Sequence, residues 1–200
     1  MVPLNSDCRV IVMAKAPVSG YAKTRLIPAL GAEGAAQLAQ RLLRHAIAQA
    51  VAAGIGPVDL CCAPDAQHAV FAELAADERV TLSEQGGGDL GARMDRALQR
   101  ALTTHACAVL IGTDAPALDA AVLRAARDRL AEHDAVLGPA LDGGYTLIGL
   151  RHIEPSLFEA MPWSTPQVLA LTRERLQSAG LRHAELPPLH DIDEPADLVH

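Results

Sequence analysis

The chain has 200 residues, a formal net charge of −7 and an isoelectric point near 5.5. A surface for nucleic acid requires a basic face, so this charge excludes nucleic acid as a partner, although it leaves room for a small basic pocket. Half of the residues are hydrophobic and only 2% are aromatic, which predicts an aliphatic core and one domain that covers residues 1–200.

Apolar segments of strand length alternate along the chain with stretches of helix length, which is typical of βαβ units and a mostly parallel sheet. The expected strands are residues 8–14, 58–63, 80–82, 108–111, 135–138, 145–150 and 183–186. The expected helices are residues 32–53, 66–75, 119–133 and 166–179, together with a helix that Asp89 caps and that buries Leu90, Met94, Leu98 and Leu102.

The first expected strand is followed by a loop rich in permanent cations, namely Lys15, Lys23 and Arg25. A loop at the carboxyl end of a parallel strand is where α/β proteins bind phosphate. Lysine supplies a point charge and arginine a two-pronged donor, so the loop is suited to a polyphosphate. The alternative is a solvated turn. The stretch is no Walker A motif, because Ala22 stands before Lys23 where that motif has glycine.

Two acidic stretches are candidates for a cation site. Thr113 and Asp114 follow the strand at residues 108–111, and a carboxylate there can hold Mg²⁺ or a ribose. Asp191 and Asp193 lie near the end of the sequence and would form the second half of a cation site. The alternatives are local, since Asp114 can cap the turn before Pro116 and Asp193 can begin a short helix.

Three further stretches have both a structural and a functional interpretation. The segment Asp142–Tyr145 is either a hairpin turn or a place where a ligand approaches the backbone, with Asp142 on the acceptor or the metal. Residues 84–94 form either a loop with a helix cap or a loop over a base or sugar, with Arg93 near phosphate. Trp163 either precedes a capped helix or stacks on a sugar or base.

Cysteine usage and the first residues bear on location. The four cysteines, at positions 8, 61, 62 and 107, lie in apolar runs without a zinc-binding spacing. Buried free thiols are expected in a reducing cytoplasm. Residues 1–7 lack the features of a secretion signal, and no stretch is long enough to span a bilayer. We expect a cytoplasmic protein without a membrane partner, and the sequence leaves its oligomeric state open.

Taken together, these motifs resemble those of the radical-SAM/selenodomain-associated transferases, a family of glycosyltransferase-A-like proteins. The matching stretches, in chain order, are Ala14–Pro17, Lys23–Leu26, Gly88–Met94, Gly112–Pro116, Asp142–Tyr145, Trp163–Thr165 and Asp191–Asp193. The family is similar to the guanylyltransferases of molybdenum-cofactor and deazaflavin-cofactor synthesis. The resemblance implies a three-layer α/β/α nucleotide-diphospho-sugar transferase fold with a mixed, mostly parallel sheet.

The resemblance also implies roles for individual residues. Asp114 would hold Mg²⁺ or Mn²⁺ with Asp193 as a second ligand, and Lys23 and Asp114 would be catalytic. The residues expected on the nucleotide and its phosphates are Ala14, Lys15, Ala16, Lys23, Arg25, Gln85, Gly88, Arg93 and Thr113. Those expected on the acceptor are Asp142, Gly143, Gly144, Tyr145, Trp163, Ser164 and Thr165. The chain departs from the family in one respect, because the usual acidic pair is reduced to the single acid Asp114.

The sequence therefore predicts a Mg²⁺-dependent transferase with a nucleotide donor and a small-molecule acceptor. The leading reaction is glycosyl transfer from a nucleotide sugar. Nucleotidyl transfer from a nucleoside triphosphate is the first alternative, because three cations suit a triphosphate. A non-catalytic protein that binds nucleotide sugars is the second, because one acid of the usual pair is missing.

Overall fold

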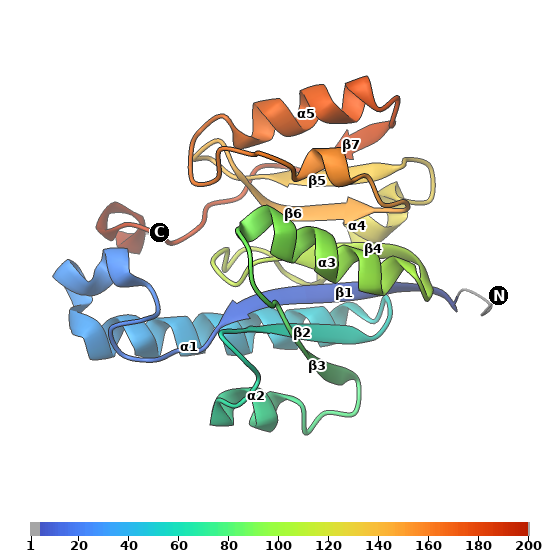
Figure 1. Ribbon diagram of the computed structural model, residues 1–200. Helices are drawn as coiled ribbons and strands as arrows, with labels where there is room; N and C mark the ends of the chain where they lie inside the picture. Colours follow the sequence, from blue (N-terminus) through green and yellow to red (C-terminus); the bar gives the residue numbers. More distant parts are fainter. Residues whose placement is uncertain (1–4, 200) are drawn as a thin grey trace.

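Seven strands form one sheet in the order β3-β2-β1-β4-β6-β5-β7 in the computed structural model, which describes residues 5–199 (Figure 1). The strands are β1 (Asn5–Lys15), β2 (Val58–Ala63), β3 (Val80–Glu84), β4 (His105–Ile111), β5 (Ala135–Pro139), β6 (Tyr145–Leu150) and β7 (His183–Glu185). All neighbouring pairs are parallel except the two that β6 makes with β4 and β5. The predicted mixed, mostly parallel sheet is confirmed.

Helices cover both faces of this sheet. They are α1 (Ile27–Ala53), α2 (Ala69–Leu74), α3 (Leu90–Leu102), α4 (Ala120–Arg129) and α5 (Val168–Ser178), with short 3₁₀ turns η1 (Thr24–Leu26), η2 (Pro155–Leu157) and η3 (Pro195–Val199). Helices α1, α2 and α4 contribute to one apolar cluster, and α3 and α5 contribute to the other. The molecule is therefore a three-layer α/β/α sandwich.

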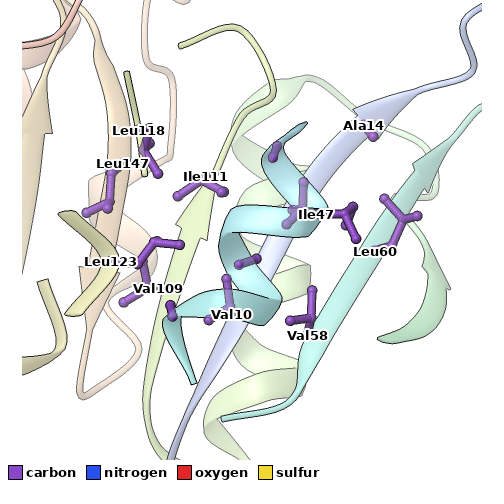
Figure 2. Packing of buried hydrophobic residues seen from close by; sticks show 14 of the residues in the cluster. Val10, Ala14, Ile47, Val58, Leu60, Val109, Ile111, Leu118, Leu123 and Leu147 are labelled. Carbon is purple, nitrogen blue, oxygen red and sulfur yellow. The ribbon is translucent and has the colours of Figure 1, made fainter. Parts of the chain in front are cut away.

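The alternation of side chains along β1 shows how the two layers are built. Val10 and Val12 belong to the cluster under α1, and Ile11 between them belongs to the cluster under α3. This is the two-residue period of a strand buried on both faces. Figure 2 shows the first cluster, in which Ile47 of α1 lies over Val10 and Leu60.

The strand directions bring several loops to one edge of the sheet. The parallel strands all end at that edge, and β6 begins there because it runs the opposite way. The loop after β1, the loop after β3, the turn after β4, the β5–β6 hairpin and the segment after β7 therefore meet. In Figure 1 the loop between β1 and α1 and the C-terminal segment lie close together at one end of the molecule.

Some expectations about individual elements are corrected. Leu90 is 45% exposed and is not part of the buried stripe of α3, of which it is the first residue; the buried residues are Gly91, Met94, Ala97, Leu98 and Ala101. Helix α1 begins five residues earlier than expected, with a non-helical glycine, Gly31 (φ 70°), at a kink.

Two predictions about location can be compared with the structure. All four cysteines are buried and free. Within residues 5–199, no helix has the length and apolar character needed to cross a membrane. Residues 1–4 of the N-terminal stretch, in which we expect no secretion signal, lie outside the described part of the chain.

Candidate functional site

A cleft of about 640 Å³ lies at the edge where the loops meet. Of the residues that the sequence assigns to a site, those that line the cleft are Ala14, Lys15, Lys23, Arg25, Gln85, Gly88, Arg93, Thr113, Asp114, Asp142, Gly144, Tyr145, Trp163, Ser164, Thr165, Asp191 and Asp193. Ala16 and Gly143 do not line it. Segments from both ends of the chain thus share one concave surface.

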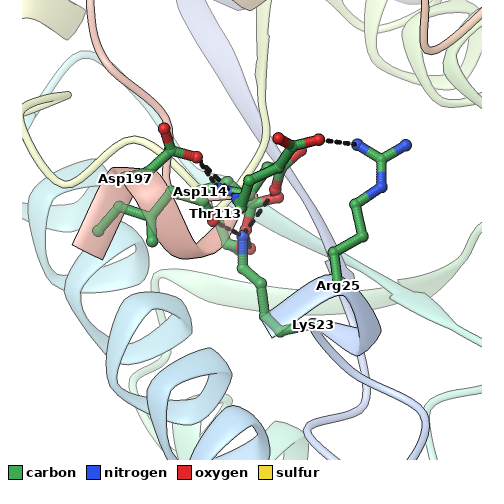
Figure 3. A network of polar contacts seen from close by, with 8 residues as sticks. Lys23, Arg25, Thr113, Asp114 and Asp197 are labelled. Carbon is green, nitrogen blue, oxygen red and sulfur yellow. Dashed lines mark hydrogen bonds and ion pairs between the residues drawn. The ribbon is translucent and has the colours of Figure 1, made fainter. Parts of the chain in front are cut away.

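Lys23, which lines the cleft, is the centre of a network of polar contacts (Figure 3). Its Nζ lies 2.7 Å from Asp114 Oδ1 and 2.9 Å from Asp193 Oδ1, and it also donates to the carbonyl oxygen of Ile192. An ammonium has three protons to donate, so these partners satisfy all of them. The side chain of Lys23 is only 7% exposed, whereas each of the two carboxylates is 42% exposed.

The backbone aims Lys23 at these partners. Lys23 has a left-handed conformation (φ 50°, ψ 44°) directly before η1. Its neighbours Ala22 and Leu26 are buried, 3% and 0% exposed, and anchor the loop on the core. A non-glycine residue in this conformation is strained by about 1–3 kcal/mol, and the three bonds of the ammonium offset that cost.

Asp114 is held by its neighbours on both sides. Thr113 Oγ1 donates to Asp114 Oδ1 at 3.2 Å, and the Ile192 amide donates to the Asp114 carbonyl at 2.8 Å. Burial in the cleft raises the pKa of Asp114 above its usual range, and the charge of Lys23 works in the opposite direction. Burial therefore favours the protonated form of the Asp114 carboxyl, whereas the positive charge of Lys23 favours the ionised form.

Other carboxylates lie near this pair. Burial, followed by the charges of Asp142 and Asp193, raises the pKa of Asp191 to about 6. Asp142 itself accepts a bond from the Gly144 amide at 2.8 Å and so shapes the hairpin turn. The concentration of negative charge opposite Lys23 makes the cleft attractive to cations.

The carboxylates suit a hard divalent cation, with one qualification. Mg²⁺ usually takes one or two protein carboxylates, which Asp114 and Asp193 can supply, together with phosphate oxygens. Among residues 5–199, however, no group of three or more histidine, cysteine or acidic side chains is arranged to hold a metal. In this structure the Lys23 ammonium, rather than a free space, separates the two carboxylates.

The C-terminal segment is folded so that Asp193 is free for Lys23. The Asp197 carboxylate accepts bonds from the amides of Asp193 and Glu194, at 2.9 and 2.7 Å. Asp197 thus accepts hydrogen bonds from the backbone amides just before η3, whereas the sequence suggested that the Asp193 side chain caps this short helix. The Asp193 side chain instead points to the cleft.

The glycine-rich loop after β3 is tied to the sheet by Gln85. This side chain is 5% exposed, and its Nε2 donates to the carbonyls of Ala14 and Cys61 at 3.1 and 3.0 Å. Gln85 therefore connects the ends of β1 and β2 through its amide nitrogen. Arg96, which the sequence did not single out, binds the carbonyls of Gln85 and Gly87. The one feature of the sequence that could have indicated this role is the position of Arg96 on the helix that follows the loop.

The other cations of the cleft differ in their surroundings. Lys15 is exposed and forms no ion pair with any described residue. Arg25 is 4.0 Å from Glu194, and Arg93 Nε donates to the Gly88 carbonyl at 2.9 Å. Lys15 and Lys23 are also the only two lysines of the chain, a property that is useful experimentally.

The aromatic residues predicted on the acceptor form a wall of the cleft. Tyr145 and Trp163 meet edge to face, with centroids 6.5 Å apart. Tyr145 Oη and Trp163 Nε1 are buried without a hydrogen-bond partner in the described chain. Contact of these residues with a ligand would therefore be made by the rings rather than by their polar atoms.

Ser164 and Thr165 shape the chain beside this wall. Ser164 has φ 63°, and Thr165 Oγ1 donates to the Pro162 carbonyl at 2.8 Å. Gly143 packs against Pro166: a Cβ on Gly143 would lie 2.4 Å from the Pro166 carbonyl oxygen. The requirement for glycine at position 143 is therefore explained by close packing against the segment before α5.

A family model described as "uncharacterized protein conserved in bacteria (DUF2064)" matches residues 42–165 of the chain. The chain belongs to this family. The DUF2064 match includes Asp114, whereas Lys23 and Asp193 lie outside it. A search of curated proteins finds no match to the chain.

Solved structures extend the comparison. A proposed nucleotide-diphospho-sugar transferase from Desulfovibrio desulfuricans G20 is 30% identical, with a TM-score of 0.88 over 97% of this chain and 85% of that chain. Rv0371c from Mycobacterium tuberculosis H37Rv, in complex with manganese, is 21% identical, with a TM-score of 0.61 over 96% of each chain. The 4-diphosphocytidyl-2C-methyl-D-erythritol synthase of Anaerococcus prevotii is 8% identical, with a TM-score of 0.63 over 98% of this chain and 96% of that chain. The expected nucleotide-diphospho-sugar transferase fold is confirmed.

Proposed function

We propose that this protein is a divalent-metal-dependent transferase that takes a nucleotide donor into the cleft and passes part of it to a small-molecule acceptor. The observation that carries the proposal is the meeting of Lys23, Asp114 and Asp193 at the carboxyl edge of the sheet. In open α/β sheets, ligands bind outside the carboxyl ends of the strands. The similarity to the Desulfovibrio protein supports a nucleotide sugar as the donor.

The residues of the chain would act mainly by position and charge. Lys15, Arg25 and Arg93 line the cleft and would bind the phosphates of the donor. Asp114 and Asp193 would hold Mg²⁺ or Mn²⁺, which, when bound, offsets negative charge on phosphate oxygens. The Tyr145 and Trp163 rings would position the acceptor and exclude water.

Two reactions are compatible with this arrangement. In glycosyl transfer the acceptor attacks the sugar carbon that carries the diphosphate, the bond from that carbon to the diphosphate oxygen breaks, and a nucleoside diphosphate leaves. In nucleotidyl transfer the acceptor attacks the α-phosphate and pyrophosphate leaves. We place glycosyl transfer first, because the Desulfovibrio protein, which is 30% identical to this chain, is described as a nucleotide-diphospho-sugar transferase. The number of cations around the cleft favours the second reaction, because a triphosphate carries more charge. The kinship with the cofactor guanylyltransferases stays a prediction.

A two-stage experiment tests the proposal. Thermal-shift measurements with nucleoside triphosphates and nucleotide sugars, each with and without Mg²⁺ or Mn²⁺, identify the donor, because a ligand of the native state raises the melting temperature. Release of nucleoside diphosphate or pyrophosphate from that donor then identifies the reaction. Binding without release under any acceptor condition would favour the non-catalytic alternative, and the absence of any nucleotide-dependent shift would contradict the proposal.

Variants test the assignment of the residues. Asp114→Asn and Lys23→Ala should each reduce turnover by about 10²–10³-fold, the effect of losing one preorganised charged group. Asp114→Asn removes a carboxylate proposed to hold the metal, and Lys23→Ala removes a cation available to the phosphates. Arg44→Ala is the matched control, because Arg44 pairs with Glu73 on the surface, away from the cleft residues. Full turnover in both cleft variants would remove Lys23 and Asp114 from the mechanism.

A further inference from the structure

The position of the Lys23 ammonium has a consequence for how a metal enters the cleft. The ammonium contacts Oδ1 of Asp114 and Oδ1 of Asp193, and its third proton goes to the Ile192 carbonyl. A cation that bridged the two carboxylates through these oxygens would occupy the position of the ammonium, and one bound through the other carboxylate oxygens would lie next to it. An ammonium and a divalent ion in contact with one another would also repel. The two positive groups therefore exclude each other at this point.

Lys23 needs a new partner before it can leave. Its side chain is 7% exposed, so withdrawal of the carboxylates would leave a nearly buried charge unpaired, which is costly. A polyphosphate in the cleft supplies such a partner, since Lys23 lines the same cavity as Lys15, Arg25 and Arg93. The lysine side chain is flexible and can turn from carboxylate to phosphate without a change in the sheet.

We propose that Lys23 is an internal counter-ion that keeps divalent metal out of the empty cleft and releases Asp114 and Asp193 only when a polyphosphate binds. Metal and donor then bind cooperatively, each raising the affinity of the other by the same factor. Lys23 has two successive partners in this scheme, the carboxylates in the free protein and the phosphates in the loaded protein. The inference rests on the proposed donor site, and it goes further by assigning the order of events there.

The first test measures Mn²⁺ binding to the nucleotide-free protein by electron paramagnetic resonance. Lys23→Met removes the charge and keeps most of the side-chain volume. We expect it to bind Mn²⁺ roughly tenfold more tightly than the wild type or better, because a like charge has been removed from the site. Lys15→Met is the matched control, since Lys15 lines the cleft without pairing with a described carboxylate. It should bind Mn²⁺ as the wild type does.

A double variant locates the gained affinity. Lys23→Met combined with Asp193→Asn should bind Mn²⁺ no better than the wild type. Equal Mn²⁺ affinity in Lys23→Met and wild type overturns the proposal, as does a gain that survives in the double variant. Circular dichroism checks that each variant is folded.

A second measurement uses the wild type and does not depend on any variant. Because the chain has only two lysines, the ¹⁵N-labelled side-chain ammonium spectrum contains only the signals of Lys15 and Lys23, which the Lys15→Met protein assigns. We expect the Lys23 signal to stay in place with Mg²⁺ alone and to shift when inorganic tripolyphosphate is added with Mg²⁺. A shift with Mg²⁺ alone, or no shift with both, contradicts the proposal.

The outcome is separable from that of the proposed function. Turnover of a nucleotide donor, together with unchanged Mn²⁺ affinity in Lys23→Met, would leave the transferase standing and remove the counter-ion role. A gain of Mn²⁺ affinity in Lys23→Met, in a protein that binds no nucleotide donor, would contradict the transferase proposal and leave standing the exclusion of metal by Lys23.

Discussion

Lys23 Nζ and Asp193 Oδ1 lie 2.9 Å apart, although 170 positions separate the two residues in the chain. This contact joins the loop after β1 to the segment after β7. The Ile192 amide also bonds the Asp114 carbonyl, so the C-terminal segment is bonded both to the loop after β1 and to the turn after β4. Asp191 and Asp193 of this segment thus line the cleft.

The first prediction concerns Asp193→Asn. We expect turnover to fall by about 10²–10³-fold, since one of the two carboxylates proposed to hold the metal is lost. The free energy of unfolding should fall by only about 1 kcal/mol, because the amide oxygen of asparagine can still accept from Lys23. Steady-state kinetics and urea unfolding measure the two effects.

Glu194→Gln is the control for Asp193→Asn. Glu194 is the next residue and is exposed, with Arg25 4.0 Å away. We expect its turnover and stability to stay near those of the wild type. A loss in Glu194→Gln as large as that in Asp193→Asn would show that the segment, rather than the Asp193 carboxylate, is what matters.

The meeting of Lys23, Asp114 and Asp193 could be predicted in outline from the sequence. Each follows a strand, and the carboxyl ends of parallel strands share one edge. The direct contacts could not be predicted, because they depend on the left-handed backbone of Lys23 and on the way Asp197 folds the final segment. The residue types at these positions do not indicate either feature, since lysine does not favour a positive φ.

The remaining differences have a similar cause. Leu90 fits a helical period but is the first residue of α3 and lines the cleft instead of the core. Arg96 looks like any exposed helical arginine until the glycine loop folds back on it. Gly143 is in a motif that also suits a ligand, and only the three-dimensional fold shows that Pro166 packs against it. Periodicity describes an element by itself, whereas these residues are defined by contacts between elements.

The second prediction concerns Gln85. Gln85→Ala removes the donor to the buried ends of β1 and β2 and leaves a small cavity. The loss in the free energy of unfolding should be about 2–4 kcal/mol. Glu84→Ala, at the exposed neighbouring position, should change stability by less than about 0.5 kcal/mol. Urea unfolding of both variants decides the matter, and equal losses would contradict a specific role of the Gln85 amide.

The third prediction compares two adjacent glycines of the β5–β6 hairpin. Gly143 has φ 91°, and a Cβ there would lie 2.4 Å from the Pro166 carbonyl oxygen. At Gly144 the nearest atom to a Cβ is Asp142 Oδ1, on a movable side chain at 3.2 Å. Gly143→Ala should therefore destabilise by about 1–3 kcal/mol through steric overlap and strain, and Gly144→Ala by less.

Thermal unfolding of both glycine variants measures this difference. Donor binding provides a second measurement, because Gly144 lines the cleft and Gly143 does not. Once the loss of folded protein is corrected for, Gly143→Ala should keep its donor affinity. A reduced donor affinity in fully folded Gly143→Ala would show that Gly143 affects the ligand site as well as the fold, although the sequence suggested only an acceptor role for it.

The fourth prediction concerns alkaline stability. Burial raises the pKa of Tyr145 above the ordinary value of 10.0. Below about pH 10 the folded and unfolded states both keep the phenol proton. At higher pH the unfolded chain loses that proton and the folded protein keeps it. The free energy of unfolding should therefore fall by up to about 1.4 kcal/mol per pH unit above pH 10.

Tyr145→Phe removes this contribution and isolates it. The phenol oxygen is buried near Thr172, whose hydroxyl donates to the Val168 carbonyl, so removal of the phenol oxygen should change stability at neutral pH by less than about 1 kcal/mol. Above pH 10 the variant should lose stability less steeply than the wild type. Urea unfolding across this pH range tests the difference, and parallel profiles for the two proteins would mean that the Tyr145 phenol ionises in the folded state as readily as in the unfolded chain.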